Sequence, residues 1–354
     1  MVSLVPGGMG GSETYARELV RNLADSSRVA AQTWVSRAGI GFSDGLVEHV
    51  VDIRGGSSTG ARLLTMLQAR RDRQQIRREM AGMDVVHFPF TAPVPWPAQD
   101  AAVTVSLLDV QHLDLPHMFS RSERLYRRRY YDHAARTADA VVTISGFAKQ
   151  RIVERLGIDP DRITVAHLGV EGAGFEPNLG DRERFLLYPA RGWPHKNHAR
   201  LIEAVGLLRA DHTDLRLVLT GGELSALAPL PDWVDVRGVV PRAELRELYR
   251  RAACLVFPSL YEGFGLAALE AMASGCPVAA SDASSLPEIC GDAAVLFDAK
   301  EPSAIAAGAA AAMERSTDLQ RRGLERVRSF TWAGCAAAHE DAYASAFAAR
   351  QGGS

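Results

Sequence analysis

The sequence predicts an α/β protein made of two doubly wound, Rossmann-like domains. Short runs of aliphatic and β-branched residues alternate along the chain with segments of helical period, and this alternation occurs twice. Continuous apolar strands that alternate with helices are typical of a parallel sheet covered on both faces. The length of 354 residues exceeds one typical domain and suits two.

The first domain is expected to cover residues 1–170. Its predicted strands are residues 2–5, 29–36, 47–53, 84–90, 102–108, 140–145 and 163–169. Between the first two of them, Ala16, Leu19, Val20 and Leu23 recur at helical spacing. We expect this helix to begin at Glu13, with Ser12 as its N-cap.

The second domain is expected to cover residues 171–331, after a polar link that contains Gly and Pro at 169–184. Its predicted strands are residues 185–190, 215–221, 234–240, 254–259 and 277–281, with helices from about 198, 242 and 266. A last helix, residues 332–354, is expected to pack back on the first domain. In such sheets ligands bind beyond the carboxyl ends of the strands, so two facing domains would form one cleft.

Composition excludes several classes of protein. The net charge of −2, with 47% hydrophobic and 23% charged residues, argues against a dedicated nucleic-acid binder. No apolar run is long enough to span a membrane and no signal peptide is recognisable, so we expect a cytoplasmic protein. Four cysteines without a CxxC pair predict reduced, packed thiols.

A basic stretch at residues 121–139 is the one segment that suggests a surface partner. The pattern favours a solvated helix face, and the alternative is peripheral contact with an anionic membrane at its inner face.

The first loop of interest is "VPGGMGGSETYARELV", in which Gly10 and Gly11 precede a helix. Glycines at a helix N-terminus let backbone N–H groups approach a phosphate or a sugar. An ordinary strand-to-helix turn explains the loop equally well.

The second loop is "LLYPARGWPHKNHARLIEA", which carries Arg191 and Lys196 beyond a strand, with Asn197 placed to cap the next helix. Two cations at this position favour an anion site, and two solvated surface charges are the alternative. His195 and His198 have no third ligand beside them, so we do not expect metal binding.

The third loop is "PSLYEGFGLAALEAMASGCPV", in which Gly263 and Gly265 lead into a helix from Leu266. The free N–H groups of the helix would suit a diphosphate. Glu270 lies one turn inside this apolar helix, where a buried charge needs partners. A pair of ligand hydroxyls, such as a ribose diol, would satisfy it, and a salt bridge to an Arg or Lys is the alternative.

This last segment, followed by "SSLPEICGDAAVLF", resembles the donor-site signature of family 4 retaining glycosyltransferases, which have the GT-B fold. The resemblance extends through "GGSETYARELVRNL", "DVVHFP", "LLDVQHLDLPHMFSRSERLYRRRYYDHAARTADAVVTIS", "PARGWPHKN" and "VRGVVPRAELRELYRRA", in the family's order.

The resemblance implies a nucleotide-sugar site. Arg191 and Lys196 match the family's diphosphate-binding pair, Glu270 would hold the ribose hydroxyls, and the backbone near Val240 would meet the base. The sugar and diphosphate would be held by Glu262 and the backbone of Gly263, Phe264, Gly265 and Leu266. Gly10 and Gly11 match the loop that approaches the donor phosphate and the acceptor.

One departure from the family concerns the residue before Asp109. Many relatives carry a His there, and this chain has Leu108. His112 is our candidate to act in its place, against the alternative of a packed or surface histidine.

The implied mechanism is retaining. The diphosphate would leave the anomeric carbon while the acceptor hydroxyl enters on the same face and passes its proton to a leaving phosphate oxygen. The residues expected to act are Arg191, Lys196, Glu262 and His112. No metal is expected, because two cations already face the diphosphate, and Asp159-Pro160-Asp161 has the residues of a turn.

We therefore expect a glycosyltransferase that moves a hexosyl group, mannosyl from GDP-mannose, to a hydroxyl of a saccharide, glycolipid or small metabolite. No single residue separates guanine from uracil or thymine, and the acceptor contacts lie in loops without a readable pattern. The alternatives are a nucleotide-sugar epimerase, which would convert donor without acceptor, and a non-catalytic sugar-nucleotide-binding protein.

Overall fold

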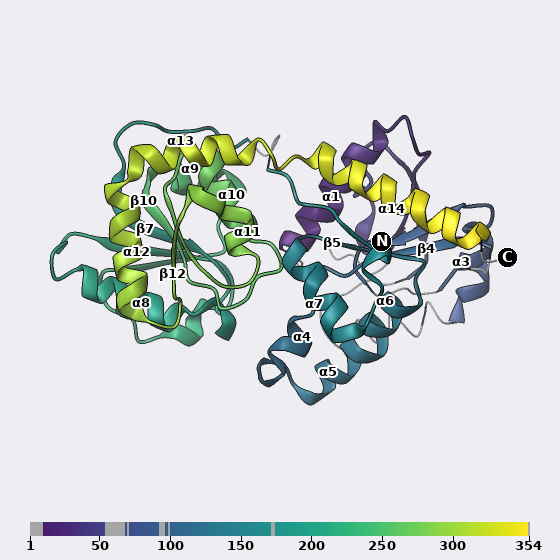
Figure 1. The fold of residues 1–354 in the computed structure, drawn as a ribbon, viewed down its shortest axis with the longest axis horizontal. Coiled ribbons are helices and arrows are strands. Elements are labelled where there is room, and N and C mark those ends of the chain that lie inside the picture. The colour runs from purple at the N-terminus through teal and green to yellow at the C-terminus, as the bar shows by residue number, and fades with distance from the viewer. Residues whose placement is uncertain are drawn as a thin grey trace. The chain divides into compact units, whose positions relative to one another are not determined.

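The computed structural model describes residues 10–53, 68, 71–91, 96–97, 100–170 and 174–352. The chain divides into two compact units, Met1–Leu168 with Trp332–Ser354, and Gly169–Thr331. Each unit is an α/β structure built on parallel strands (Figure 1). The strand expected at residues 2–5 lies outside the described residues.

The first unit contains a four-stranded parallel sheet in the order β3-β4-β5-β6 and a parallel pair β1-β2. The strands are β1 (Gln32–Ser36), β2 (Val47–Val51), β3 (Val85–Phe88), β4 (Ala102–Ser106), β5 (Ala140–Thr143) and β6 (Ile163–Val165). Every residue of β4 and β5 is buried, as expected for continuous apolar strands in a covered sheet. Each of these strands was predicted from the sequence.

Helices and short turns join these strands. They are α1 (Gly11–Ala24), η1 (Arg37–Gly39), α3 (Arg73–Glu79), α4 (Gln111–Asp114), η2 (Pro116–Met118), α5 (Arg121–Arg127), η3 (Arg128–Asp132), α6 (His133–Thr137), α7 (Gly146–Leu156), η4 (Pro160–Arg162) and α14 (Trp332–Gly352). The π-helical η3 joins α5 to α6, so the basic stretch forms one continuous helical segment.

The start of α1 differs from the prediction. The helix begins at Gly11 and its N-cap is Gly10, whose φ of 57° and ψ of −130° favour glycine. The carbonyl of Gly10 accepts from the backbone N–H groups of Glu13 and Thr14, at 3.0 and 3.2 Å. The prediction of Ser12 as N-cap is therefore wrong, because a glycine conformation opens the helix two residues earlier. The predicted apolar face of α1 is buried.

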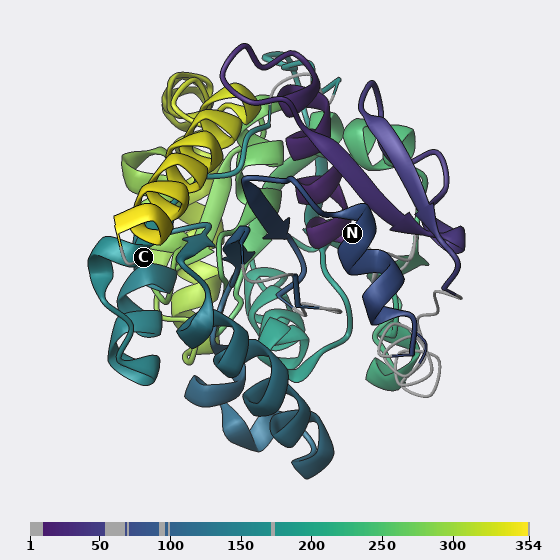
Figure 2. The ribbon, with the colours of Figure 1, turned by 90° about the vertical axis from the view of Figure 1, so that its right-hand side faces the viewer.

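The C-terminal helix α14 belongs to the first unit, where it contacts α1, β4 and β5 (Figure 2). A buried hydrogen-bond network joins these elements. The hydroxyl of Tyr15 lies 2.7 Å from His339 Nε2 and 2.6 Å from Ser106 Oγ. His87 Nε2 lies 2.7 Å from the same Ser106 hydroxyl, and its Nδ1 lies 2.8 Å from the hydroxyl of Tyr343. Polar side chains thus fix α14 against the sheet.

The second unit contains one six-stranded parallel sheet in the order β12-β11-β10-β7-β8-β9. Its strands are β7 (Glu183–Pro189), β8 (Arg216–Thr220), β9 (Val234–Gly238), β10 (Ala252–Phe257), β11 (Val278–Ser281) and β12 (Val295–Phe297). Five of them were predicted from the sequence, and β12 was missed. The chain runs outward from β7 to β9 and then returns to place β10 on the other side of β7. The strand order therefore reverses between β7 and β10, the position at which doubly wound sheets bind ligands.

The helices of this unit confirm the predicted starts at 198, 242 and 266. They are α8 (His198–Leu208), α9 (Arg242–Arg251), α10 (Leu266–Ala273), α11 (Leu286–Cys290), α12 (Pro302–Glu314) and α13 (Ser316–Val327), with turns η5 (Pro194–Lys196), η6 (Leu224–Leu227) and η7 (Gly291–Ala293). All four cysteines of the chain are buried and free, as predicted.

Candidate active site

The loops that follow β7 and β10 meet at the reversal point of the second sheet. The backbone N–H of Leu260 donates to the carbonyl of His195 at 2.8 Å. The hydroxyl of Tyr188, on β7, donates to the carbonyl of Lys196 at 2.9 Å and lies 3.0 Å from Ser259 Oγ. The two loops are therefore held together by backbone and buried side-chain contacts.

Asn197 strengthens this junction in a way that the sequence did not predict. It occupies the N-cap position of α8 with a left-handed φ of 62°, but its side chain makes no capping bond. Instead its buried amide donates to the carbonyls of Pro258 and Ala299, at 3.0 and 2.7 Å. The predicted capping bond is wrong: the side-chain oxygen that would accept it, Oδ1, instead accepts from the Arg200 guanidinium at 3.0 Å. Asn197 thereby ties together the loops after β7, β10 and β12.

Lys196 and Glu262 form an ion pair across these loops. Lys196 Nζ lies 2.6 Å from Glu262 Oε1, and the two side chains are only 16% and 13% exposed. The backbone of Glu262 is fixed as well, since its N–H donates to Ser284 Oγ at 2.9 Å and its carbonyl accepts from Ser285 Oγ at 3.0 Å. The structure thus brings together two of the predicted catalytic residues.

Arg191 lies in the same loop as Lys196 but has a different partner. Its guanidinium lies 3.3 Å from Glu223 Oε1 and 5.4 Å from the centre of the Trp193 ring. The Trp193 indole donates to the other oxygen of Glu223 at 2.8 Å. Arg191 is therefore a half-exposed cation held beside the loop, and a ligand diphosphate would have to compete with Glu223 for it.

The start of α10 is shaped by Gly265. This residue is the N-cap of α10 and has a φ of 112°, a value that side-chain-bearing residues rarely adopt. A Cβ atom at Gly265 would lie 2.6 Å from Cδ2 of Leu286. The preceding carbonyl, that of the buried Phe264, accepts from Ser285 Oγ at 2.7 Å. The position of the helix N-terminus, where the first backbone N–H groups have no partner within the helix, therefore depends on a close approach to Leu286 that only glycine permits.

Glu270 lies one turn inside α10 and is buried, as the sequence predicted. The hydroxyl of Tyr249 donates to its Oε2 at 3.0 Å, and a guanidinium nitrogen of Arg242 lies 3.7 Å from its Oε1. Burial raises the pKa of Glu270, and the Arg242 charge and the Tyr249 hydroxyl offset part of that rise. The salt bridge considered from the sequence is therefore present. Because the Arg242 nitrogen is 3.7 Å away, Oε1 of Glu270 has no close hydrogen-bond donor among the described residues, and a ligand hydroxyl could bind there.

Sequence reasoning missed these partners of Glu270, although a signal was available. Arg242 and Tyr249 are seven residues apart on α9, which places them on one helical face. It also missed Arg182, in the segment read as a link. The Arg182 guanidinium donates to the carbonyls of Tyr249, Arg250 and Ala252 at the C-terminal end of α9, and to those of Asn178 and Ser274. No local pattern marks such a residue, because its acceptors are distant backbone carbonyls.

The remaining predicted donor residue of the second unit is Val240. It is half-buried and follows β9, at the same carboxyl edge of the sheet as the loops above. Gly10 and Gly11 belong to the first unit, at the start of α1, where both are exposed.

His112 belongs to the first unit, on α4, and its side chain is fully buried. Its Nε2 lies 2.9 Å from Asp132 Oδ1. This contact agrees with the alternative of a packed histidine, and the catalytic role stays a prediction. Leu108, at the position where relatives carry His, is half-buried after β4.

Two findings concern metals and membranes. Within the described ranges, no three His, Cys, Asp or Glu side chains gather to hold a metal ion. Asp159 and Asp161 lie in a turn in which the Asp159 carboxylate accepts from the Asp161 N–H at 2.9 Å, as predicted for turn residues. Of the helices that the structure describes, none is both long and apolar enough to cross a bilayer.

Comparison with known proteins identifies relatives across nearly the whole chain. The chain is 27% identical to O-antigen chain mannosyltransferase B of Escherichia coli over 93% of this chain and 94% of that protein. It is 30% identical to the MMP alpha-(1->4)-mannosyltransferase of Mycolicibacterium hassiacum over 62% and 59%. Among solved structures, the fold resembles sucrose-phosphate synthase from Thermosynechococcus elongatus, with a TM-score of 0.76 at 20% identity over 96% and 94% of the two chains. It also resembles Anabaena HepE in complex with UDP-glucose, with a TM-score of 0.69 at 16% identity over 94% and 96%.

Family models account for both units. Residues 9–172 match the model described as Glycosyltransferase Family 4, and residues 173–328 match Glycosyl transferases group 1. The relatives of this family are named as sugar transferases, and the solved neighbours share the arrangement of two Rossmann-like domains. The chain therefore belongs to glycosyltransferase family 4 and is a hexosyltransferase with the GT-B fold.

Proposed function

We propose that the protein transfers a mannosyl group from GDP-mannose, with retention of configuration, to a hydroxyl of a saccharide, glycolipid or small-metabolite acceptor. The observation that carries this proposal is the Lys196–Glu262 pair, which lies between the loops after β7 and β10 and near the N-terminus of α10. This combination of a cation, a carboxylate and a helix N-terminus suits a diphosphate joined to a sugar.

Each part of the donor has a proposed partner. The diphosphate would accept hydrogen bonds from Lys196 and, after Glu223 is displaced, from Arg191. The sugar would contact Glu262, and the diphosphate would also meet the backbone of Gly263, Phe264, Gly265 and Leu266. The ribose hydroxyls would donate to Glu270, and the base would lie near Val240. On the first unit, Gly10 and Gly11 are the proposed loop toward the donor phosphate and the acceptor.

The chemistry that these residues can support is charge stabilisation. As the diphosphate leaves, negative charge grows on its oxygens, and one preorganised contact to that charge is typically worth about 3 kcal/mol. In the proposed mechanism the acceptor proton passes to a leaving phosphate oxygen, so no enzyme nucleophile is needed. Since Lys196 and Arg191 supply the positive charge, we propose that transfer needs no divalent metal. Full activity after dialysis against EDTA is expected, and loss of activity that Mn²⁺ restores would contradict it.

The mannosyl and guanine assignments depend on the relatives. Two of the most similar relatives are named mannosyltransferases, while one structural neighbour is described as binding UDP-glucose. Thermal-shift measurements with GDP, UDP, dTDP and ADP separate these donors, and we expect the largest rise in Tm with GDP. A larger rise with UDP would replace GDP-mannose by a UDP-sugar.

A cytoplasmic location, with peripheral contact at the inner face of the membrane, is also proposed. The feature that supports it is the basic helical segment α5 to α6 in the first unit. Sedimentation with anionic vesicles is expected to retain the protein at low salt, and absence of binding would remove the membrane from its partners.

The decisive experiment combines turnover with matched variants. Lys196→Ala and Glu262→Ala are each expected to lower transfer to a panel of acceptors by at least about 10²-fold while the fold remains intact. Arg251→Ala is the control, because Arg251 pairs with Glu183 at the amino end of β7, away from the proposed site. Full turnover in Lys196→Ala would refute the assignment. Incubation of donor alone tests the epimerase alternative, since only an epimerase converts the sugar without an acceptor.

A further inference from the structure

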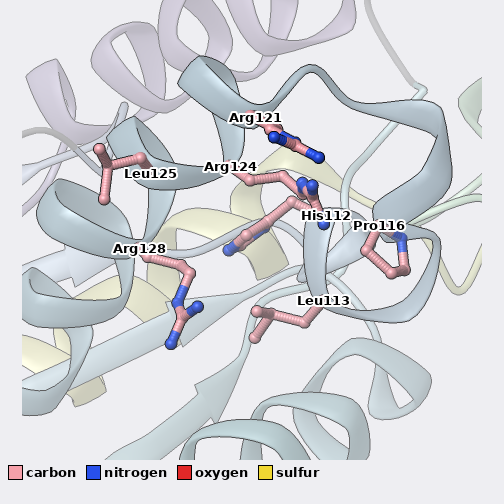
Figure 3. Close-up of a pocket in the computed structure, with 7 residues that line it drawn as sticks. All are labelled: His112, Leu113, Pro116, Arg121, Arg124, Leu125 and Arg128. Carbon is pink, nitrogen blue, oxygen red and sulfur yellow. The ribbon is translucent and has the colours of Figure 1, made fainter.

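A basic pocket lies in the first unit, apart from the residues proposed to bind the donor. Its volume is about 380 Å³, within the range of small-molecule sites. It is lined by His112, Leu113, Pro116, Arg121, Arg124, Leu125 and Arg128. Figure 3 shows Arg121 and Arg124 extending from α5 toward the segment that carries His112 and Pro116. The pocket therefore lies between one helical face rich in arginine and the short elements α4 and η2.

The arrangement of the arginines follows from the helix period. Arg121, Arg124 and Arg128 stand at positions i, i+3 and i+7 of the continuous segment formed by α5 and η3. The neighbouring Arg127 falls on another face, where it pairs with Glu123 at 3.1 Å. Three positive charges are thus gathered on one wall, an arrangement that costs free energy unless an anion compensates it.

In the part of the chain that the structure describes, no carboxylate compensates these arginines. Among the described residues, none of the three makes an ion pair or a side-chain hydrogen bond, and Nε of Arg124 is buried without a partner. The nearby acids are engaged elsewhere. Asp114 pairs with Arg151 and Arg155, Asp132 with His112, and Glu123 with Arg127.

His112, which also lines the pocket, has a second unpaired buried atom. A carboxylate only accepts hydrogen bonds, so Nε2 of His112 carries the proton in its bond to Asp132. The other ring nitrogen, Nδ1, is buried and has no hydrogen-bond partner. Buried polar atoms are nearly always paired, and both of these exceptions belong to residues that line the pocket, which favours a polar ligand there.

The position of the pocket in the fold agrees with a ligand site. One wall of the pocket is formed by α4 and η2, and these elements follow the carboxyl end of β4, which ends at Ser106. Parallel α/β sheets bind ligands at this edge of the sheet. The three arginines offer planar, multiply donating guanidinium groups, which suit phosphate, and Leu113, Pro116 and Leu125 offer an apolar surface beside them.

We propose that this pocket binds a phosphate group carried by the acceptor. The phosphate is either that of a phosphorylated sugar or that which joins the acceptor to a lipid, and the apolar residues contact the adjoining carbon atoms. This inference rests on the proposed transfer reaction, since the acceptor is the substrate that it concerns.

Binding of named probes tests the proposal with the full-length protein. The probes are inorganic phosphate, mannose 6-phosphate and mannose by titration calorimetry, and vesicles of phosphatidylcholine with or without phosphatidylglycerol by sedimentation. Arg124→Gln is the test variant, and Arg127→Gln, on the same helix but outside the pocket, is the control. Arg121→Gln, at an exposed position, gives a second test if Arg124→Gln does not fold.

We expect mannose 6-phosphate or the phosphatidylglycerol vesicles to bind, and mannose and pure phosphatidylcholine not to bind. Loss of a charge-assisted contact is expected to weaken that binding at least about ten-fold in Arg124→Gln, whereas Arg127→Gln should leave mannose 6-phosphate binding unchanged and weaken vesicle binding much less, because it removes only one surface charge of the basic segment. Preference for mannose 6-phosphate identifies a soluble acceptor, and preference for the vesicles identifies a lipid-linked one. Equal weakening by Arg124→Gln and Arg127→Gln, or no binding of any phosphate probe, would overturn the proposal.

GDP binding measured on the same variants separates this inference from the proposed function. It should be unchanged by Arg124→Gln. If wild-type protein binds the phosphate probe through Arg124 but neither binds GDP nor turns over GDP-mannose, the pocket stands and the proposed donor is wrong.

Discussion

Lys196 Nζ and Glu262 Oε1 lie 2.6 Å apart, although the residues belong to loops that follow two different strands. The strands, β7 and β10, are neighbours at the reversal point of the sheet, and both loops leave it at the same edge. A contact between residues 66 positions apart in the chain is therefore a direct consequence of strand order. Because both side chains are mostly buried, each charge depends on the other until a ligand arrives.

The first prediction concerns this mutual dependence. Lys196→Ala is expected to lower the free energy of unfolding by about 1–3 kcal/mol, because it leaves the Glu262 charge poorly compensated. The double variant Lys196→Ala/Glu262→Ala should cost less than the sum of the single variants. Chemical denaturation measures the coupling, and additive effects would show that the pair contributes nothing to stability. Transfer should fall by about 10²- to 10³-fold in Lys196→Ala if Lys196 stabilises the leaving diphosphate.

The second prediction separates binding from stability at Glu270. Burial raises the pKa of this carboxyl, so its charge is costly in the absence of ligand. Glu270→Gln should therefore leave the free energy of unfolding unchanged or raise it, while GDP affinity falls about ten-fold, because charge-assisted hydrogen bonds to the ribose are lost. Glu247→Gln, at an exposed position of α9, is the control. Unchanged GDP affinity in Glu270→Gln would remove Glu270 from the donor site.

The third prediction tests Gly265, the N-cap residue that positions the start of α10. Gly265→Ala combines an unfavourable φ with a clash against Leu286, so we expect a loss of more than about 2 kcal/mol in the free energy of unfolding. Gly157→Ala isolates the backbone cost, because Gly157 has a φ of 64° and open space around its Cα. It should lose only about 1 kcal/mol. The double variant Gly265→Ala/Leu286→Ala gains room but adds a cavity, and it should not restore GDP binding. Equal stability of the two single alanine variants would refute the role of the contact.

The fourth prediction is a pH dependence of stability in the first unit. Burial lowers the pKa of His339 to about 4 and that of His87 well below its usual value of 6.5. Both rings are therefore neutral in the folded protein, whereas the unfolded chain takes up protons as the pH falls below about 6.5. The stability that they contribute is present above pH 6.5 and is lost as the pH falls toward 4, by roughly 3 kcal/mol for His339.

Denaturation in urea across this range measures that slope. His339→Gln removes one of the two groups, so its stability should fall less steeply with acid than that of the wild type. His117→Gln, in the η2 turn, is an exposed control and should retain the wild-type slope. A slope unaffected by His339→Gln would mean that other groups control acid unfolding.

Much of the fold could be predicted because it depends on local periodicity. β4 and β10 are continuous apolar runs, and α9 and α10 begin where loops with Gly or Pro end. The errors fall where a local pattern is too short or a backbone conformation decides. β12 is a short strand, only partly buried, and it was not predicted. α1 begins early because Gly10 adopts a conformation that other residues avoid.

The sequence predicted which loops form the candidate site, but it did not predict the side-chain contacts within the site. Resemblance to a family and the position of loops after strands led to the prediction that Lys196, Glu262 and Glu270 belong to the donor site. The sequence did not reveal that Tyr249 and Arg242 would meet Glu270, because side-chain partners in different helices depend on how those helices pack. For the same reason, the bonds from Asn197 to distant carbonyls were not anticipated.

The unpaired arginines of the basic pocket also bear on how this enzyme can diversify. Residues with several hydrogen bonds, such as Asn197, cannot be exchanged without leaving other groups unsatisfied, so the loops that they join resist mutation. In the described parts of the chain, the side chains of Arg121, Arg124 and Arg128 make no ion pair and no hydrogen bond, and replacing them relieves mutual repulsion. Single substitutions at these arginines can therefore alter the choice of acceptor while the second unit and its stability stay the same. New acceptor specificities can arise in this region of the chain with little loss of stability.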